Sequence, residues 1–181
     1  IAKSGLPVNV IFTADRGGDA YEEEATQIAK KVFRYDRDGL SSEIKELLQA
    51  SQIILDGIYG IGFHPPLPDS LRPLLQTINQ SKPKANVVSI DCASGIDCDS
   101  GYADPDAVQA GTTISVHRIK AGQLIGDAAV KSGQICPIRM KLAPNLPVYS
   151  RISRQMITID LIHSLLPERP NISNKGSFGT V

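Results

Sequence analysis

The stretch VVSIDCASGIDCDSG, Val87–Gly101, places a largely apolar run directly before a loop rich in aspartate, serine and glycine. A short β-branched run that ends at turn-forming residues is typical of a buried strand, so a strand is predicted to end at Asp91. In an open parallel sheet, ligands bind beyond the carboxyl ends of the strands. The loop after Asp91 is therefore a candidate site, and its residue types leave a metal site, a redox pair, a nucleophile turn and an acidic loop open.

Strands and helices alternate along most of the chain. Strands are expected at residues 7–13, 52–56, 86–90 and 112–116; helices at residues 19–32, 40–50 and 71–79; and a short connector, 126–130, before residues 134–139. This alternation predicts the α/β class, with a mostly parallel sheet and helices on both faces. Beyond residue 150 the character changes to a capped, amphipathic stretch, 153–166, and a linker, 167–171.

Composition excludes several classes of protein. The chain has 181 residues, of which 41% are hydrophobic, enough to build a core without metals or disulfides. Lysine plus arginine and aspartate plus glutamate number 19 each, so no net charge attracts nucleic acid or a membrane surface. No apolar run approaches the roughly 20 residues that span a bilayer. The chain opens without methionine, which indicates a segment of a longer polypeptide, and no signal pattern opens it. A cytoplasmic location is expected.

The three cysteines fit neither a redox pair nor a zinc site. Cys92 and Cys98 are too far apart for a CxxC motif, and four-ligand zinc spacing is absent. With Cys136 they make an odd number, so free thiols in a reducing compartment are expected.

Charged side chains follow several of the predicted strands. Asp56 and Asp91 each end a strand and precede a glycine-containing loop, and Lys120 follows a third strand. Two carboxylates, Ser94 and a lysine could therefore converge on one edge of the sheet. Two simpler interpretations stay open: Asp56 can cap the next turn, and a single lysine is usually a solvated surface charge.

Other chemistries lack their sequence patterns. A nucleophile elbow around Ser94 would need glycine where Cys92 and Ile96 stand, and no histidine is well placed as its base. The loop lacks the fuller acidic pattern of a calcium site, and Asp97 and Asp99 are interpreted as turn residues. An ordinary NAD-dependent dehydrogenase would need an opening GxGxxG fingerprint, which is absent.

Three motifs together indicate a family. IDCASGIDCDSG, residues 90–101, resembles VDIPSGLDADTG of the YjeF N-terminal domain family, the NAD(P)HX epimerases. DGIYGIG, residues 56–62, is similar to the family's DALFGTG, and VHRIKAG, residues 116–122, to its FGAPKPG. Order and spacing agree across most of residues 5–140.

The resemblance implies a Rossmann-like three-layer α/β sandwich and an isomerase. Its activity would be the interconversion of the R and S epimers of NADHX and NADPHX, hydrated nicotinamide dinucleotides. It implies that Asp56 and Ser94 hold a potassium ion. Asp91 and Lys120 would be the catalytic residues, and Asp91 would also contact the substrate. The resemblance further implies a homo-oligomer. The implied substrate-binding loop comprises Gly60, Ile61, Gly62, Phe63, His64, Pro65 and Pro66.

The end of the chain resembles a second enzyme. RPNISNKGSFG, residues 169–179, is similar to the RxxxSHKGxxG pattern that opens NAD(P)HX dehydratase domains, which are lyases, with Asn174 in place of the histidine. The resemblance predicts an epimerase-like domain over residues 1–150. Residues 151–181 would be a linker and the start of an ADP- or ATP-dependent dehydratase in a bifunctional repair enzyme.

Departures from the family pattern support an alternative. Cys92-Ala93 stands where the family has Ile-Pro, Ile61 replaces a loop threonine, and Arg118 and Ala121 replace small and proline residues. The family's NNGGDG loop would precede Ile1. These changes favour a catalytically silent binding or dimerisation module on the same fold.

Overall fold

The computed structural model describes residues 5–15, 17–18, 20–83, 85–141, 147–151 and 156–166. The chain forms two compact units, residues 1–140 and residues 141–181. All of the predicted site residues belong to the first unit.

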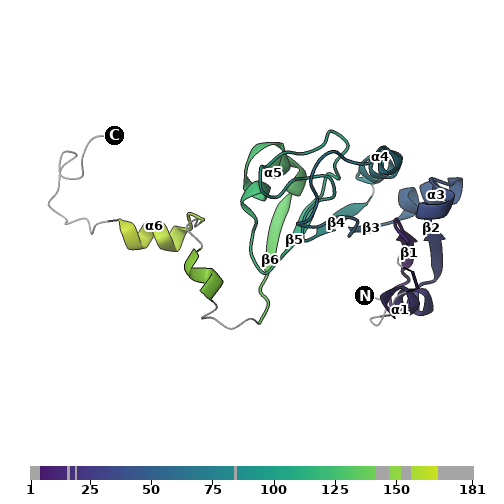
Figure 1. Cartoon of the computed structure of the whole chain (residues 1–181), viewed down its shortest axis with the longest axis horizontal. Helices are drawn as coiled ribbons and strands as arrows, with labels where there is room; N and C mark the ends of the chain where they lie inside the picture. Colours follow the sequence, from purple (N-terminus) through teal and green to yellow (C-terminus); the bar gives the residue numbers. More distant parts are fainter. Residues whose placement is uncertain are drawn as a thin grey trace. The chain divides into compact units, whose positions relative to one another are not determined.

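A four-stranded parallel sheet is the centre of the first unit (Figure 1). Its strands are β3 (Ile53–Asp56), β4 (Asn86–Ile90), β5 (Thr112–Val116) and β6 (Gln134–Ile138), and they neighbour one another in chain order. The α/β class and the parallel sheet are thereby confirmed. Because every strand runs the same way, the loops that follow β3, β4 and β5 begin at one edge of the sheet.

A second, two-stranded parallel sheet precedes it in the chain. β1 (Asn9–Phe12) pairs with β2 (Lys31–Arg34), and α1 (Ala20–Ile28) connects them. The predicted helix over residues 19–32 is therefore wrong at its end. The β-branched and aromatic character of Val32 and Phe33 favours the strand, which gains a backbone partner in β1.

Side chains of the first helix tie it to this small sheet. Glu22 of α1 is buried and forms an ion pair with Arg34 at the end of β2. The guanidinium carbon of Arg34 lies 4.8 Å from the centre of the Phe12 ring on β1, a cation–π contact. The residues Tyr35–Asp38 then form the single turn α2.

The remaining helices of the unit begin and end where local signals place them. α3 (Ser42–Ala50) is capped by Ser41, whose hydroxyl accepts a hydrogen bond from the Ile44 amide at 3.2 Å. α4 (Arg72–Ser81) follows a 3₁₀ turn over residues 69–71 and keeps its proline in the first turn, as the sequence predicts.

One segment expected as a connector is a helix. α5 spans Gly126–Ser132 and ends at Gly133, whose φ of 60° is left-handed backbone. Seven residues give too little periodicity for a helix to be distinguished from a loop. Ala128 of α5 is fully buried and helps to cover the sheet.

One face of the sheet is packed and the other is open. The helices α4 and α5 lie on the same side of the sheet in Figure 1. Their apolar side chains join α3 and alternate strand residues in one core, which includes Ile44, Leu48, Ile54, Leu74, Leu75, Ile78, Val87 and Ala128.

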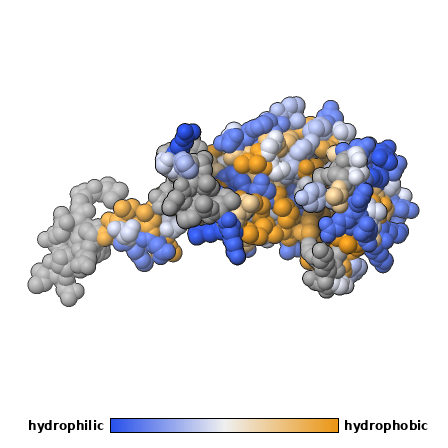
Figure 2. Space-filling view, turned by 60° about the horizontal axis from the view of Figure 1, so that its bottom comes forward, coloured by the Kyte–Doolittle hydropathy of each residue, from blue (hydrophilic) through white to orange (hydrophobic). Residues whose placement is uncertain are grey.

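The opposite strand positions carry aliphatic side chains that stay 37–60% exposed, namely Ile53, Leu55, Ile90, Val116 and Ile138. Figure 2 shows hydrophobic residues gathered on one surface of the molecule.

The second unit contributes a 3₁₀ helix, Pro147–Arg151, and one α-helix to the described residues. α6 (Ile159–Leu165) is capped by Thr158, whose hydroxyl accepts from the Leu161 amide at 3.2 Å, so the capped stretch predicted over residues 153–166 is helical in its second half. Residues 152–155, the linker 167–171 and the dehydratase-like motif 169–179 lie outside the described residues. No helix in the described part of the chain combines the length and apolar character that crossing a membrane requires.

The contact between two loops near the sheet edge predicts a stability effect. A Cβ on Gly122 would lie 2.4 Å from the carbonyl carbon and oxygen of Cys98. Both are backbone atoms, which cannot avoid the clash by rotating as a flexible side chain can. Replacing Gly122→Ala should lower the free energy of unfolding by about 1–3 kcal/mol, measured by urea denaturation. Gly57→Ala is the matched control, because no atom lies within 4 Å of its added Cβ. Equal stability of the two variants would contradict the close approach.

Candidate functional site

Asp56, at the end of β3, is a buried carboxylate with uncharged partners. Its Oδ2 accepts hydrogen bonds from the Ser89 hydroxyl at 2.7 Å and the Ser94 amide at 2.9 Å. Its Oδ1 accepts from the Ser94 hydroxyl at 2.5 Å and the Ile58 amide at 3.3 Å. Burial raises the pKa of Asp56, although these four hydrogen bonds act in the opposite direction. The bond from Ile58 is the turn-capping interaction expected of Asp, but it is only one of the four.

Ser94 connects the loops that follow β3 and β4. Its hydroxyl donates to Asp56 and accepts a hydrogen bond from the Tyr59 amide at 2.9 Å. The side chain is fully buried, so it does not present a nucleophile to solvent. The predicted proximity of Asp56 and Ser94 is therefore present in the structure.

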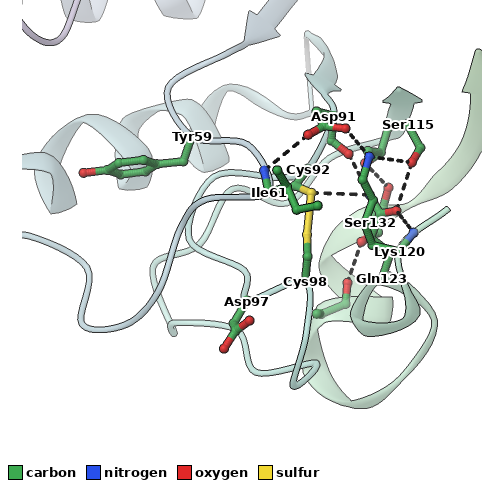
Figure 3. Close-up of a disulfide and its surroundings, with 12 residues drawn as sticks. Tyr59, Ile61, Asp91, Cys92, Asp97, Cys98, Ser115, Lys120, Gln123 and Ser132 are labelled. Carbon is green, nitrogen blue, oxygen red and sulfur yellow. Dashed lines mark hydrogen bonds and ion pairs between the residues drawn. A yellow bond between two sulfur atoms is a disulfide. The ribbon is translucent and has the colours of Figure 1, made fainter. Parts of the chain in front are cut away.

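Asp91, directly after β4, forms an ion pair with Lys120 (Figure 3). Its Oδ1 also accepts from the Val116 amide at 3.2 Å, and its Oδ2 accepts from the Ile61 amide at 3.2 Å. The ammonium of Lys120 donates in addition to the Ser115 hydroxyl at 3.2 Å. The side chain of Lys120 is only 12% exposed, so it is not the solvated surface charge that a single lysine usually is.

The backbone at Asp91 adopts an uncommon conformation. Its φ is 70°, in the left-handed region that few residues other than glycine, asparagine and aspartate occupy. The peptide groups on both sides are held, because the Asp91 amide donates to the carbonyl of Ile114 at 2.8 Å and its own carbonyl accepts from Gln123 at 2.8 Å. Backbone conformations of this kind cluster at functional sites.

The predicted substrate loop, residues 60–66, divides into parts with different surroundings. Gly60 passes so close to Asp91 that an added Cβ would lie 3.2 Å from its Oδ2, and the Ile61 amide is directed at the same oxygen. Phe63 is buried against Tyr59, with ring centres 5.1 Å apart. The rest of the loop, Gly62, His64, Pro65 and Pro66, is exposed.

An ion-pair network supports the loop that carries Ser94. Arg72, at the start of α4, binds both oxygens of the buried Asp104 at 2.7 and 3.1 Å. The Asp104 amide in turn donates to the carbonyl of Gly95 at 2.9 Å. Gly95 has φ 97°, and an added Cβ would lie 2.9 Å from the Cα of Ala107, so only glycine allows the two segments to meet.

Two cysteines of the loop are paired, which corrects the expectation of free thiols. Cys92 and Cys98 form a disulfide in the structure, and Cys136 is free (Figure 3). The chain turns between them, with the Ile96 amide donating to the Ala93 carbonyl at 3.2 Å, and it turns again after Asp97, where the Gly101 amide donates to the Asp97 carbonyl at 3.0 Å. Asp97 shapes this turn by accepting from the Asp99 amide at 2.9 Å, as expected of a turn aspartate.

Two residues of the site were not predicted from the sequence. Ser89 is buried beside Asp56, and Gln123 is buried beneath the Asp91–Lys120 pair. Ser89 lies two positions after the buried Val87 on β4, so strand alternation could have assigned its side chain to the packed face of the sheet. Nothing in the local sequence distinguishes Gln123 from a surface glutamine.

Potential ligand sites elsewhere are few among the described residues. They contain no group of three or more histidine, cysteine, aspartate or glutamate side chains arranged to hold a metal. A hollow of about 640 Å³ lies between β2 and α3, lined by residues 31–34, 38 and 41–44. It includes none of the predicted site residues.

Comparison with known proteins identifies the family. The model of the "YjeF-related protein N-terminus" matches residues 1–122 of the chain. The chain belongs to this family. A bifunctional NAD(P)H-hydrate repair enzyme of Vibrio cholerae is 30% identical over 74% of the chain, and an NAD(P)H-hydrate epimerase of Weissella koreensis is 28% identical over 75%.

A solved structure shares the fold. The crystal structure of yeast ynu0 superposes with a TM-score of 0.58 over 75% of this chain and 55% of its own, at 16% identity. The chain covers 27% of the Vibrio cholerae enzyme and 58% of the Weissella koreensis epimerase. It therefore corresponds to only part of each of these YjeF-related relatives.

The raised pKa of Asp56 predicts a characteristic pH dependence of stability. Between the ordinary carboxyl pKa of about 4 and the raised folded value, the folded state binds more protons than the unfolded state. Stability should therefore fall as pH rises through this range, and Asp56→Asn should remove that fall. The measurement is the difference in unfolding free energy between wild type and variant from pH 2 to pH 8.

Asp97→Asn provides a control of opposite sign. Hydrogen bonds from the Asp99 amide and then the Ser100 hydroxyl lower the pKa of Asp97, so its contribution to stability should be lost as pH falls below about 4. If both variants changed the pH dependence in the same direction, the burial of Asp56 would not be the cause.

Proposed function

We propose that this chain is the epimerase part of a nicotinamide-nucleotide repair enzyme and interconverts the R and S forms of NADHX and NADPHX. The observation that carries the proposal is the Asp91–Lys120 ion pair at the carboxyl edge of the sheet, faced by the Ile61 amide of a glycine-containing loop. Membership of the YjeF-related family and the names of the epimerase relatives support the substrate class.

The ion pair has the two functions that epimerisation requires. The hydroxyl on the hydrated ring carbon must accept a proton, leave as water and return to the opposite face of the ring with loss of a proton. An alternative route opens the ring at the same carbon and needs the same two proton transfers. The Lys120 ammonium can donate the proton and the Asp91 carboxylate can accept one, since they lie in direct contact at a partly exposed position.

The loop of residues 60–66 supplies substrate contacts in this proposal. Gly60 allows the backbone to approach Asp91 closely, and the same lack of a side chain permits close approach of a dinucleotide. Backbone amides in glycine-containing loops bind phosphate oxygens. The exposed residues His64, Pro65 and Pro66 would contact the more distant parts of the substrate.

A potassium ion held near Asp56 and Ser94 is part of the proposal. The carboxylate of Asp56 is buried among two serine hydroxyls and two backbone amides, all of them uncharged, so its negative charge has no counter-charge among these partners. The oxygen atoms of Asp56, Ser89 and Ser94 suit a hard cation, which the two hydroxyls can face by rotating their hydrogens away. When bound, the ion would offset the negative charges of Asp56 and of the dinucleotide.

The wider assignments are also proposals. The bifunctional repair relatives and the dehydratase-like motif of residues 169–179 support a second, ADP- or ATP-dependent lyase activity in the same polypeptide. Assembly into a homo-oligomer and a cytoplasmic location remain predictions from the sequence.

A catalytically silent binding module is the second candidate. Ile61 and the Cys92–Ala93 pair, which depart from the family pattern, both adjoin Asp91. The side chain of Ile61 is 56% exposed at the position where substrate would bind. An assay of epimerisation separates the two candidates, because only the enzyme interconverts the epimers.

Replacing Asp91 tests the proposed reaction. Asp91→Asn keeps the size of the side chain but removes the carboxylate, so turnover should fall by about 10²–10⁴-fold. The measurement is the conversion of purified R-NADHX into the S epimer, followed by chromatography. Asp99→Asn, in an exposed position of the same loop, is the control and should retain wild-type turnover. A wild-type protein without turnover would favour the binding module, and an active Asp91→Asn variant would exclude Asp91 as the acid/base.

The potassium proposal has a test that needs no activity. Replacing N-methylglucamine chloride by potassium chloride at equal ionic strength should raise the melting temperature at pH 7, by an amount that grows as RT ln(1 + [K⁺]/Kd). At ten times Kd the gain is about 1.4 kcal/mol, or roughly 3–6 °C for a chain of this size. Asp56→Asn should abolish the difference between the two salts, whereas Asp97→Asn should keep it. Equal melting temperatures of the wild type in both salts would rule out the site.

A further inference from the structure

Gln123 is a polar side chain buried where neither composition nor motif explains it. It follows Lys120 by three residues, in the short 3₁₀ turn over residues 121–124, and its side chain is 1% exposed. A buried amide without partners costs several kcal/mol, so its position must be stabilised by hydrogen bonds.

The two ends of the Gln123 amide bind the backbones of the two residues that form the ion pair (Figure 3). Its Nε2 donates to the carbonyl oxygen of Asp91 at 2.8 Å. Its Oε1 accepts from the backbone amide of Lys120 at 2.9 Å and from the Ser115 hydroxyl at 3.1 Å. One side chain therefore connects the end of β4, the end of β5 and the loop after β5.

This connection acts on the backbone and not on the reacting groups. Asp91 holds a left-handed φ of 70°, and a fixed carbonyl on the same residue limits how its peptide can rotate. The Lys120 amide is fixed by the same side chain. Gln123 thus holds the backbone positions from which the side chains of Asp91 and Lys120 extend, without hydrogen bonding to either charged group.

We propose that Gln123 is a positioning residue that sets the distance and orientation of Asp91 and Lys120. The inference rests on the proposed epimerase function, which it deepens. Proton transfer depends steeply on geometry, and a misplacement of about 1 Å can cost about 10²-fold in rate. Substrate contacts would be affected less, because Gln123 is buried at the backbone of the pair, whereas the loop residues Gly62, His64, Pro65 and Pro66 are exposed.

The first test separates positioning from binding. Gln123→Met keeps the length of the side chain and removes both hydrogen-bonding groups. The expected result is a fall in kcat of about 10–100-fold with little change in KM. Gln76→Met is the matched control, because the amide of Gln76 on α4 bonds Asp106 at 3.0 Å, outside the site. It should leave both constants unchanged. An unchanged kcat in Gln123→Met would overturn the proposal, as would a change confined to KM.

The second test needs no turnover, so it distinguishes failure of this inference from failure of the proposed function. The rate of reductive methylation of Lys120 is measured by mass spectrometry, with Lys131, which donates to the carbonyl of Pro105 at 3.1 Å, as internal reference. In Gln123→Met the rate at Lys120 should rise severalfold while that at Lys131 stays constant. A parallel rise at both lysines, or no rise at either, would overturn the proposal.

A second variant keeps the proposal testable if Gln123→Met does not fold. Gln123→Glu retains the size of the side chain and an oxygen acceptor for the Lys120 amide, but it replaces the donor to the Asp91 carbonyl by a second acceptor. Its Lys120 should methylate faster than in the wild type, and kcat should fall with KM retained. Wild-type behaviour of Gln123→Glu in both measurements would also overturn the proposal.

Discussion

Parallel pairing of β3, β4 and β5 is the constraint on which the site depends. The register places Asp56 beside Ser89 and Ile90 beside Ile114, so the chain leaves the sheet at Asp56 and Asp91 along one edge. The loops that follow can then exchange hydrogen bonds over 30 or more residues of sequence, as Ile61 does with Asp91 and Tyr59 with Ser94. A shift of one strand by one residue would turn one of the aspartates to the other face of the sheet.

The two aspartates occupy this edge in different electrostatic settings. Asp56 is held by uncharged groups in the interior, where burial raises its pKa. Asp91 is partly exposed and faces an ammonium group. The negative charge of Asp56 is therefore disfavoured by burial, whereas that of Asp91 is balanced by the Lys120 ammonium. In the proposed function, the first carboxylate holds an ion and the second transfers protons.

The sequence predicted this edge better than it predicted the surroundings. The strands at residues 86–90 and 112–116 have the predicted bounds, because β-branched runs bounded by turn residues leave little choice. The meeting of Asp56 with Ser94, and of Asp91 with Lys120, followed from the motifs and the parallel sheet. The strand β2 was missed because its four residues continue a stretch of good helix formers, and Gln123 was missed because burial of a polar side chain depends on contacts distant in sequence. The pairing of Cys92 with Cys98 depends on a turn that spacing alone does not reveal.

The open face of the sheet has a consequence for how this chain is expected to behave in solution. Parallel sheets are almost always covered on both faces, yet here five aliphatic side chains across β3, β4, β5 and β6 meet water. The formal net charge of the chain is zero, so no long-range repulsion keeps two molecules apart. We therefore expect the apolar strand positions to limit the colloidal stability of this chain, and a hydrophilic residue at Ile53 or Ile138, which are 60% and 56% exposed, to improve its solubility at little expense to the core.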